Sequence, residues 1–191
     1  ARPSTPVPAA KDPGPGALQW IDQQGGAGRA LARMEGGPVL VARGAEVRAY
    51  RLPGLEPMGR YVAGGIVLDI AVEGRLAALR LIDAVELIDL SDAAHPELRS
   101  RLAVEPSRTV IGSLGVAQGQ GGVYLRGGRL WLAVLETMPN AEQRLRVFLG
   151  DVTQPLSTRW TATWTRRQRG LDGSLLWLDG GLVGATLHMV L

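Results

Sequence analysis

The sequence has no cysteine, two histidines and one lysine among its 191 residues. Without cysteine it can form no disulfide framework, no catalytic thiol and no thiolate metal site. His95 and His188 are too few for an imidazole-based zinc or copper centre, and neither stands in a recognisable nucleophile motif. No apolar run reaches the roughly 18 residues of a membrane-spanning helix. We therefore expect no metal, no cofactor and no transmembrane segment, and no residue is assigned a catalytic role.

The basic residues are almost all arginine, Lys11 being the only lysine. This bias is as typical of a GC-rich genome or of a thermophile's hot habitat as of any ligand. The formal net charge is only +3, and the positive excess lies in the second half of the chain. A charge this small does not indicate nucleic acid as a partner.

Glycine and proline are abundant, with 26 and 12 residues, which favours many turns between short strands over a helical bundle. The length is that of one ordinary domain. Residues 1–16 contain five prolines and almost no bulky apolar side chain. They are expected to form a poorly ordered leader or tether that precedes a single domain spanning residues 17–191.

The first residue is Ala1, and the segment that follows it is rich in proline, serine and threonine. Mature exported proteins often begin this way after removal of a signal peptide, although trimming of a longer chain gives the same appearance. We expect export to the periplasm or the cell surface, and leave association with the membrane or envelope open.

Three segments share one pattern: a glycine turn, an apolar strand, a polar break, a second apolar strand and a turn containing proline. The pattern is clearest in residues 74–98, GRLAALRLIDAVELIDLSDAAHPEL, recurs in residues 127–156 and returns in shorter form in residues 36–59. Repeated units of short strands and Gly/Pro turns are typical of propeller blades. The sequence thus predicts an all-β fold, a β-propeller-like array of about three to four antiparallel blades that can be incomplete in this chain.

Apolar stretches of strand length predict the individual strands. They cover residues 18–22, 30–34, 38–42, 47–52, 61–62, 66–72, 75–81, 85–90, 109–114, 123–125, 129–135, 144–149, 159–165, 174–179 and 183–191. Two stretches, 29–35 and 76–90, keep a helical alternative because they consist largely of good helix formers.

Residues 81–98, LIDAVELIDLSDAAHPEL, resemble the LVIVD repeat of bacterial and archaeal surface proteins, in which a strand and an acidic turn end each blade. The residues that fall on the pattern are Leu87, Ile88, Asp89, Leu90, Ser91, Asp92 and Pro96. Ala93 departs from it, since the family usually has proline there, and looser copies end at Pro53 and Pro155. The resemblance implies a β-propeller on an exported protein and supplies no catalytic residues.

Carboxylates near the first repeat are the next candidates for chemistry. Asp89 and Asp92 could hold Ca²⁺ with Ser91, but a calcium site needs six to eight oxygens, and Asx turns explain the pattern better. Four more carboxylates surround one predicted hairpin, namely Asp69, Glu73, Asp83 and Glu86. Acidic residues at strand and loop ends are ordinarily solvated, so we expect these to be solvated rather than to act as an acid–base pair. The tracts 25–28 and 119–122 lack the Lys-Ser/Thr of a phosphate-binding loop and are interpreted as turns.

One basic and aromatic cluster lies in residues 159–170, RWTATWTRRQRG. It consists of Trp160, Trp164, Arg166, Arg167 and Arg169. The period-two alternation predicts a strand with both tryptophans on one face. Because Arg and Trp dominate interface hot spots, we interpret the cluster as a partner-binding site, the alternative being a solvated loop after a strand whose tryptophans face the core. The Gly/Gln-rich insertion at residues 105–122 is a second candidate contact.

Three functions follow from these observations. The first is a non-catalytic exported propeller that acts as an accessory or scaffold subunit and binds a protein partner or another copy of itself. The second is a propeller-type hydrolase or oxidoreductase subunit with its site in a loop-lined central channel. The third is a carbohydrate or cell-wall binder, which requires Trp131, Trp160, Trp164 or Trp177 to be exposed on one surface. No small-molecule ligand can be named.

Overall fold

The computed structural model describes residues 30–105, 108–110, 116–118, 120–137, 142–169, 179–183 and 186–190. The predicted leader at 1–16, the strand at 18–22 and nearly all of the strand at 174–179 lie outside these residues. Within them, antiparallel strands and a single 3-10 turn, η2 (Pro155–Ser157), make up the regular structure. The prediction of an all-β fold is therefore confirmed.

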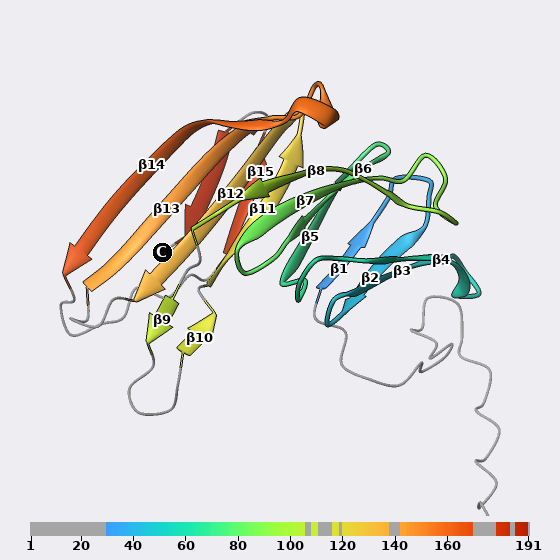
Figure 1. The fold of residues 1–191 in the computed structure, drawn as a ribbon, viewed down its shortest axis with the longest axis horizontal. Helices are drawn as coiled ribbons and strands as arrows, with labels where there is room; N and C mark the ends of the chain where they lie inside the picture. The colour runs from blue at the N-terminus through green and yellow to red at the C-terminus, as the bar shows by residue number, and fades with distance from the viewer. Residues whose placement is uncertain are drawn as a thin grey trace, which may run out of the picture.

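Three antiparallel sheets of four strands each follow one another along the chain (Figure 1). The first contains β1 (Ala30–Arg33), β2 (Val39–Arg43), β3 (Glu46–Arg51) and β4 (Glu56–Val62). The second contains β5 (Asp69–Glu73), β6 (Leu76–Arg80), β7 (Ala84–Asp89) and β8 (Glu97–Ala103). The third contains β11 (Gln120–Arg126), β12 (Arg129–Thr137), β13 (Glu142–Asp151) and β14 (Arg159–Arg169). In each sheet the strands pair in chain order, as in a meander.

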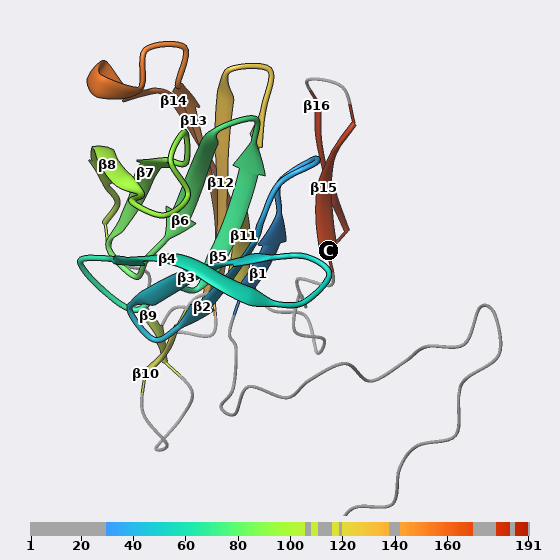
Figure 2. The same cartoon turned by 90° about the vertical axis from the view of Figure 1, so that its right-hand side faces the viewer.

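Two shorter hairpins accompany the three sheets. One pairs β9 (Arg108–Val110) with β10 (Val116–Gln118), and the other pairs β15 (Asp179–Val183) with β16 (Thr186–Val190). The first strands of the sheets, β1, β5 and β11, lie side by side, and β15 lies beside β11 (Figure 2). Both helical alternatives are wrong, because β1 occupies the first of those stretches and β6 and β7 occupy the second.

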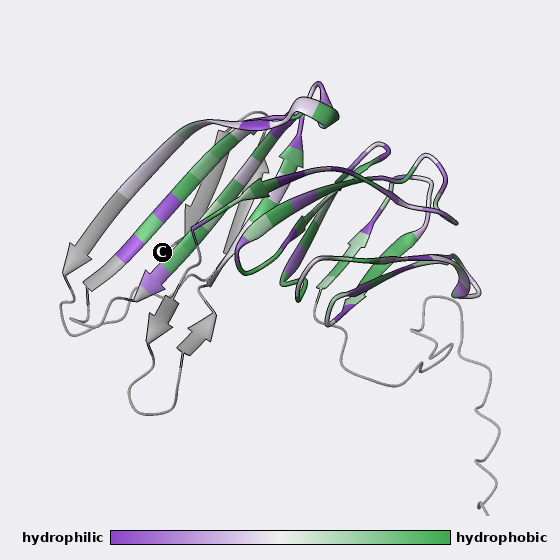
Figure 3. Cartoon of the chain, in the orientation of Figure 1, coloured by the Kyte–Doolittle hydropathy of each residue, from purple (hydrophilic) through white to green (hydrophobic). Residues whose placement is uncertain are grey.

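Hydrophobic residues recur along the strands of the three sheets (Figure 3), and buried apolar side chains form cores between neighbouring sheets. The second sheet is covered on both faces: Leu79 and Ile88 pack toward the first sheet, whereas Val85 and Leu87 pack toward the third. All four are fully buried. This two-sided burial explains why β6 and β7 have almost continuous apolar sequences.

The turns with proline lie inside each sheet and not at its end. They connect the third strand to the fourth, between β3 and β4, β7 and β8, and β13 and β14. The strand β8, with the sequence ELRSRLA, was not predicted, because its charged and apolar residues alternate without a run of apolar ones. The interpretation that the acidic turn ends a repeated unit is therefore wrong, because one more strand of the same sheet, β8, follows the turn.

Carboxylates of β5 connect the second sheet to the third. The Asp69 carboxylate accepts hydrogen bonds from the backbone N–H groups of Val123, at 2.8 Å, and Ile70, at 2.9 Å. Glu73 accepts one from the N–H of Gly127, at 2.6 Å, in the turn between β11 and β12. Gly127 and Gly128 both have positive φ there, a conformation that glycine adopts without steric cost. Burial raises the pKa of Asp69, while the two N–H groups and the charge of Arg80 oppose that rise.

A second connection joins the first sheet to the second through Glu86 of β7, which is only 2% exposed. Its carboxylate accepts hydrogen bonds from the Tyr61 hydroxyl, at 2.9 Å, and the Gly64 N–H, at 3.1 Å. It also pairs with the guanidinium of Arg101, at 2.7 Å. Burial and the Glu86 carboxylate both raise the pKa of Tyr61. The expectation of solvated carboxylates is therefore wrong for Glu86 and Asp69, which link neighbouring sheets.

Candidate partner-binding site

The fourth strand of the third sheet, β14, carries the aromatic residues selected from the sequence. It has 11 residues, the greatest length of any strand described, and it pairs with β13 alone among the described strands. A β-bulge interrupts the ladder, because Leu149 pairs with Ala162 whereas Gly150 pairs with Trp160. Thr161 is the additional residue, and its hydroxyl donates a hydrogen bond to the Leu149 carbonyl at 3.0 Å.

The bulge places the two tryptophans on opposite faces of the sheet. Directly paired residues in an antiparallel ladder share a face, so Trp164 lies on the face of its partner Val147. Trp160 lies on the other face, where its ring meets that of Phe148 at a centroid distance of 5.4 Å. The prediction of one shared face is wrong, because a single inserted residue reverses the alternation.

Trp160 is half-buried and fixes β14 to the rest of the molecule. Its indole N–H donates a hydrogen bond to the carbonyl of Ala103, the last residue of β8, at 2.9 Å. Its ring also packs against the apolar core between the second and third sheets. Trp160 thus contributes to the fold whether or not a partner touches it.

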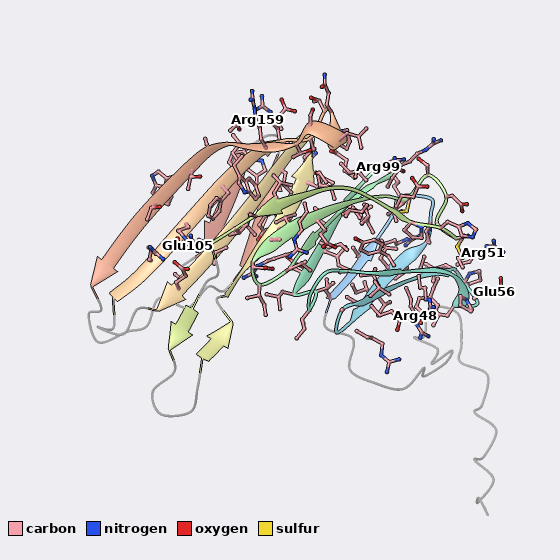
Figure 4. All side chains as sticks on the ribbon, in the orientation of Figure 1. Arg48, Arg51, Glu56, Arg99, Glu105 and Arg159 are labelled. Atoms are coloured by element: carbon pink, nitrogen blue, oxygen red, sulfur yellow. The ribbon has the colours of Figure 1, made fainter. Side chains whose placement is uncertain are left out.

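Trp164 is different, because 51% of it is exposed. The exposed residues of β14 form what we call the β14 surface, made of Arg159, Thr161, Ala162, Thr163, Trp164 and Thr165. Arg159 lies at the end of β14 beside the turn that contains η2 (Figure 4). A large aromatic ring exposed among small polar residues is the kind of feature found at protein contacts.

Arg166, Arg167 and Arg169 continue β14, and their backbones pair with Leu145, Arg144 and Glu142 of β13. The positions of their side chains lie outside the described part of the chain. Most of the second candidate contact, residues 106–119, lies outside it too, apart from the backbone of β9 and β10. Trp177 is likewise outside it.

A polar cleft of about 420 Å³ adjoins the β14 surface. Its lining consists of Asp151, Thr153, Gln154, Ser157, Arg159 and Thr161. Asp151 accepts hydrogen bonds from both the N–H and the hydroxyl of Thr153, at 2.9 Å and 2.7 Å, and these lower its pKa. Hydroxyls, an amide and one guanidinium give the cleft hydrogen-bonding capacity beside the start of β14.

Another cleft, of about 650 Å³, lies between the first sheet and the turn after β7. Arg48 and Arg60 stand directly opposite each other in the β3–β4 ladder and line this cleft together with His95. Arg48 is neutralised by Glu46, at 3.0 Å, and His95 contacts Asp92, at 2.8 Å. Gly59 is required here, because a Cβ would overlap the carbonyl groups of Ala93 and Ala94. Because Arg48 and His95 are each paired with a carboxylate, this cleft is a weaker candidate than the β14 surface.

Glu105, the first residue of the Gly/Gln-rich insertion, belongs to a network that the sequence did not reveal. Its carboxylate pairs with the guanidinium of Arg146 at 3.0 Å. Arg146 pairs in turn with Glu136, at 2.7 Å, and Glu136 also binds the Nε of Arg144, at 2.6 Å. Arg146 and Glu136 are buried, 5% and 1% exposed. The alternation of residues along β12 and β13 could have predicted that these side chains lie on the inner face of the sheet. It could not have predicted that they lie close to one another.

The acidic turn after β7 forms the predicted Asx turns. Asp89 accepts a hydrogen bond from the N–H of Ser91, at 2.7 Å, and Asp92 accepts one from the N–H of Ala94, at 2.9 Å. The guanidinium of Arg99 on β8 also donates to the Asp89 carboxylate, at 2.7 Å. The hydrogen bonds from Ser91, followed by those from Arg99, lower the pKa of Asp89 to about 2. The turn is therefore structural, and the carboxylates are occupied by internal donors.

The depressed pKa of Asp89 makes stability depend on pH. The ionised carboxylate stabilises the fold at pH values above the unfolded pKa of about 3.9 and loses that effect as the pH falls through about 2. Asp89→Asn keeps an Asx-turn acceptor but loses the charge, so it should cost about 1 kcal/mol at neutral pH, allowing for solvent screening. Urea unfolding at pH 7 and at pH 2 measures both values. A cost that is equal at the two pH values would contradict this assignment.

Among the residues that the structure describes, no group of three or more His, Asp or Glu side chains is placed to hold a metal ion. None of the described helical segments is long and apolar enough to cross a bilayer. No protein-family model matches the chain, and no curated protein matches it in sequence.

Proposed function

We propose that this protein is a non-catalytic module that binds a protein partner through the β14 surface. The observation that carries the proposal is the outermost strand of the third sheet, which exposes Trp164 and four small residues in succession along one strand. Trp160 supports the same surface from within, because its bond to Ala103 holds the strand in place. A strand that is held in place and exposes one large aromatic side chain is suited to anchor a protein interface.

We further propose that the three sheets are blades of a β-propeller. Each is a four-stranded meander, their first strands lie side by side, and their faces pack on one another through apolar cores. Neighbouring blades of a propeller are related in this way. The hairpin of β15 and β16 continues the series beside β11. This arrangement is compatible with the LVIVD-type repeat and, through it, with an exported protein at the cell surface or in the periplasm.

The two other functions receive less support. A carbohydrate binder requires Trp131, Trp160, Trp164 or Trp177 to be exposed on one surface. Trp164 is exposed, but Trp131 and Trp160 are half-buried, and Trp160 lies on the face opposite Trp164. The polar cleft beside β14 is lined, among the described residues, by six polar or charged side chains and by no tryptophan. For an enzyme, the candidate carboxylates Asp69 and Glu86 are already engaged by backbone N–H groups and side chains.

Site-specific photo-crosslinking tests the proposed binding surface. A photoreactive residue at position 164, introduced in cells that produce the protein, should give a discrete adduct with another protein. Position 98 on β8 is the matched control, because Leu98 also lies on an outermost strand and is 48% exposed. The same adducts from both positions, or none from position 164, would exclude the β14 surface as the contact.

A further inference from the structure

The outermost strands of the three sheets differ in how well they resist pairing with another strand. Exposed edge strands usually carry prolines, charges or irregularities that prevent such pairing. All three outermost strands contain a bulge, so the bulge does not distinguish them. β4 contains Pro57 together with Glu56 and Arg60. β8 has charged side chains at Glu97, Arg99 and Arg101. Both edges are therefore protected.

β14 also has a bulge, at Thr161, but its central part lacks proline and charge. Residues 160–165, WTATWT, contain no proline and no charge, and threonine and tryptophan favour extended structure. In the described part of the chain, β13 is the only strand that pairs with β14. Alternate backbone N–H and C=O groups of a regular edge strand point away from its neighbour, so beyond the bulge about half of those in residues 162–165 are available to another chain.

The charge of β14 indicates what kind of chain would pair with it. Arg159 begins the strand, and Arg166, Arg167 and Arg169 stand at its far end. No aspartate or glutamate occurs between Asp151 and Asp172. A second copy of β14 would bring the same positive charge, with no carboxylate to compensate it. An acidic extended segment offers the opposite charge at both ends of the uncharged stretch.

We propose that β14 binds an extended, acidic segment of a partner protein by adding it as a fifth strand to the third sheet. This inference rests on the proposed function, and it specifies the kind of partner and the way in which the partner binds. Backbone hydrogen bonds along residues 162–165, beyond the bulge, supply the pairing, as in other cases of strand addition. The exposed ring of Trp164 packs against an apolar side chain of the added strand, and the arginines attract its carboxylates.

Synthetic peptides test each part of the proposal. The probe is a ten-residue peptide of alternating Glu and Val, and two controls keep its length: a Lys/Val peptide and the Glu/Val peptide with alternate backbone amides N-methylated. The acidic peptide should bind, and each control should bind at least about tenfold more weakly. NMR should show slowed exchange of alternate β14 amides when the acidic peptide is present. Equal binding of the N-methylated peptide would overturn strand addition, and equal binding of the Lys/Val peptide would overturn the acidic partner.

Two matched variants locate the binding. Trp164→Lys places a charge on the β14 edge and should weaken binding of the Glu/Val peptide at least about tenfold, even though it adds a positive charge. Leu98→Lys makes the same change on β8 and should leave binding unchanged. Equal losses in both variants, or no peptide binding at all, would overturn strand addition at β14. Because crosslinking from position 164 does not depend on a strand geometry, it can still support a partner there when this inference fails.

Discussion

Replacing Glu136 by alanine is expected to destabilise the protein by about 3–5 kcal/mol, the usual cost of removing one member of a buried ion pair. Glu136 is 1% exposed, and its two carboxylate oxygens bind the guanidinium groups of Arg146 and Arg144. Without it, Arg146 stays buried with Glu105 as its remaining carboxylate partner, and that carboxylate is largely exposed. A domain of this size has about 5–15 kcal/mol of stability in total, so the loss is large. Urea unfolding monitored by tryptophan fluorescence measures it.

Two further variants show whether burial causes this cost. Glu56→Ala removes a partner of Arg51 from a pair that is about two-thirds exposed on both sides, at the far end of the molecule (Figure 4). It should change stability by no more than about 1 kcal/mol. Combining Glu136→Leu with Arg146→Met replaces the buried pair by apolar side chains and should restore most of the lost stability. If the double variant is as unstable as Glu136→Ala, an uncompensated buried charge is not the cause of the lost stability.

Replacing Glu86 by alanine is expected to cost about 2–4 kcal/mol, because it leaves buried hydrogen-bond donors without an acceptor. The carboxylate binds Tyr61 and Gly64 from the end of the first sheet and Arg101 from β8 of its own sheet. Arg101 is partly exposed and retains Asp83 as a partner, so the cost is smaller than for Glu136. Hydrogen exchange should show that the first sheet opens more readily than the third in this variant.

Asp83→Ala is the control for that experiment, because Asp83 binds the same guanidinium from a largely exposed position. It should cost less than about 1 kcal/mol. Equal effects of the two substitutions would mean that Glu86 acts only through Arg101 and does not connect the sheets.

The sequence predicts the strands well where apolar residues dominate and turns are marked by glycine or proline. The hairpin of β2 and β3 and the pair β6 and β7 lie within one or two residues of their predicted positions. The Asx turn at Asp89 was also predictable, because its hydrogen bond joins residues that are two apart in the chain. Local patterns of this kind need no knowledge of the remaining structure.

Features that depend on distant segments were not predictable in the same way. Asp69 meets Val123, 54 residues further on, and Glu86 meets Tyr61, 25 residues earlier. Nothing in the composition around these carboxylates distinguishes them from solvated ones. The bulge at Thr161 had no glycine to mark it, so the alternation of β14 predicted one face for the two tryptophans where the structure has two. The sequence correctly placed the candidate site on a strand. Which face of the sheet each tryptophan occupies could be determined only from the register of β14 with β13.

The central claim is that β14 offers an open strand edge to a partner. Hydrogen exchange of the free protein, followed residue by residue by NMR, tests it most directly. We expect alternate amides of residues 162–165, beyond the bulge, to exchange nearly as fast as those of an unfolded chain, while the intervening amides, bonded to β13, are protected. Uniform protection of all four amides would show that the edge is already covered, and would contradict the account.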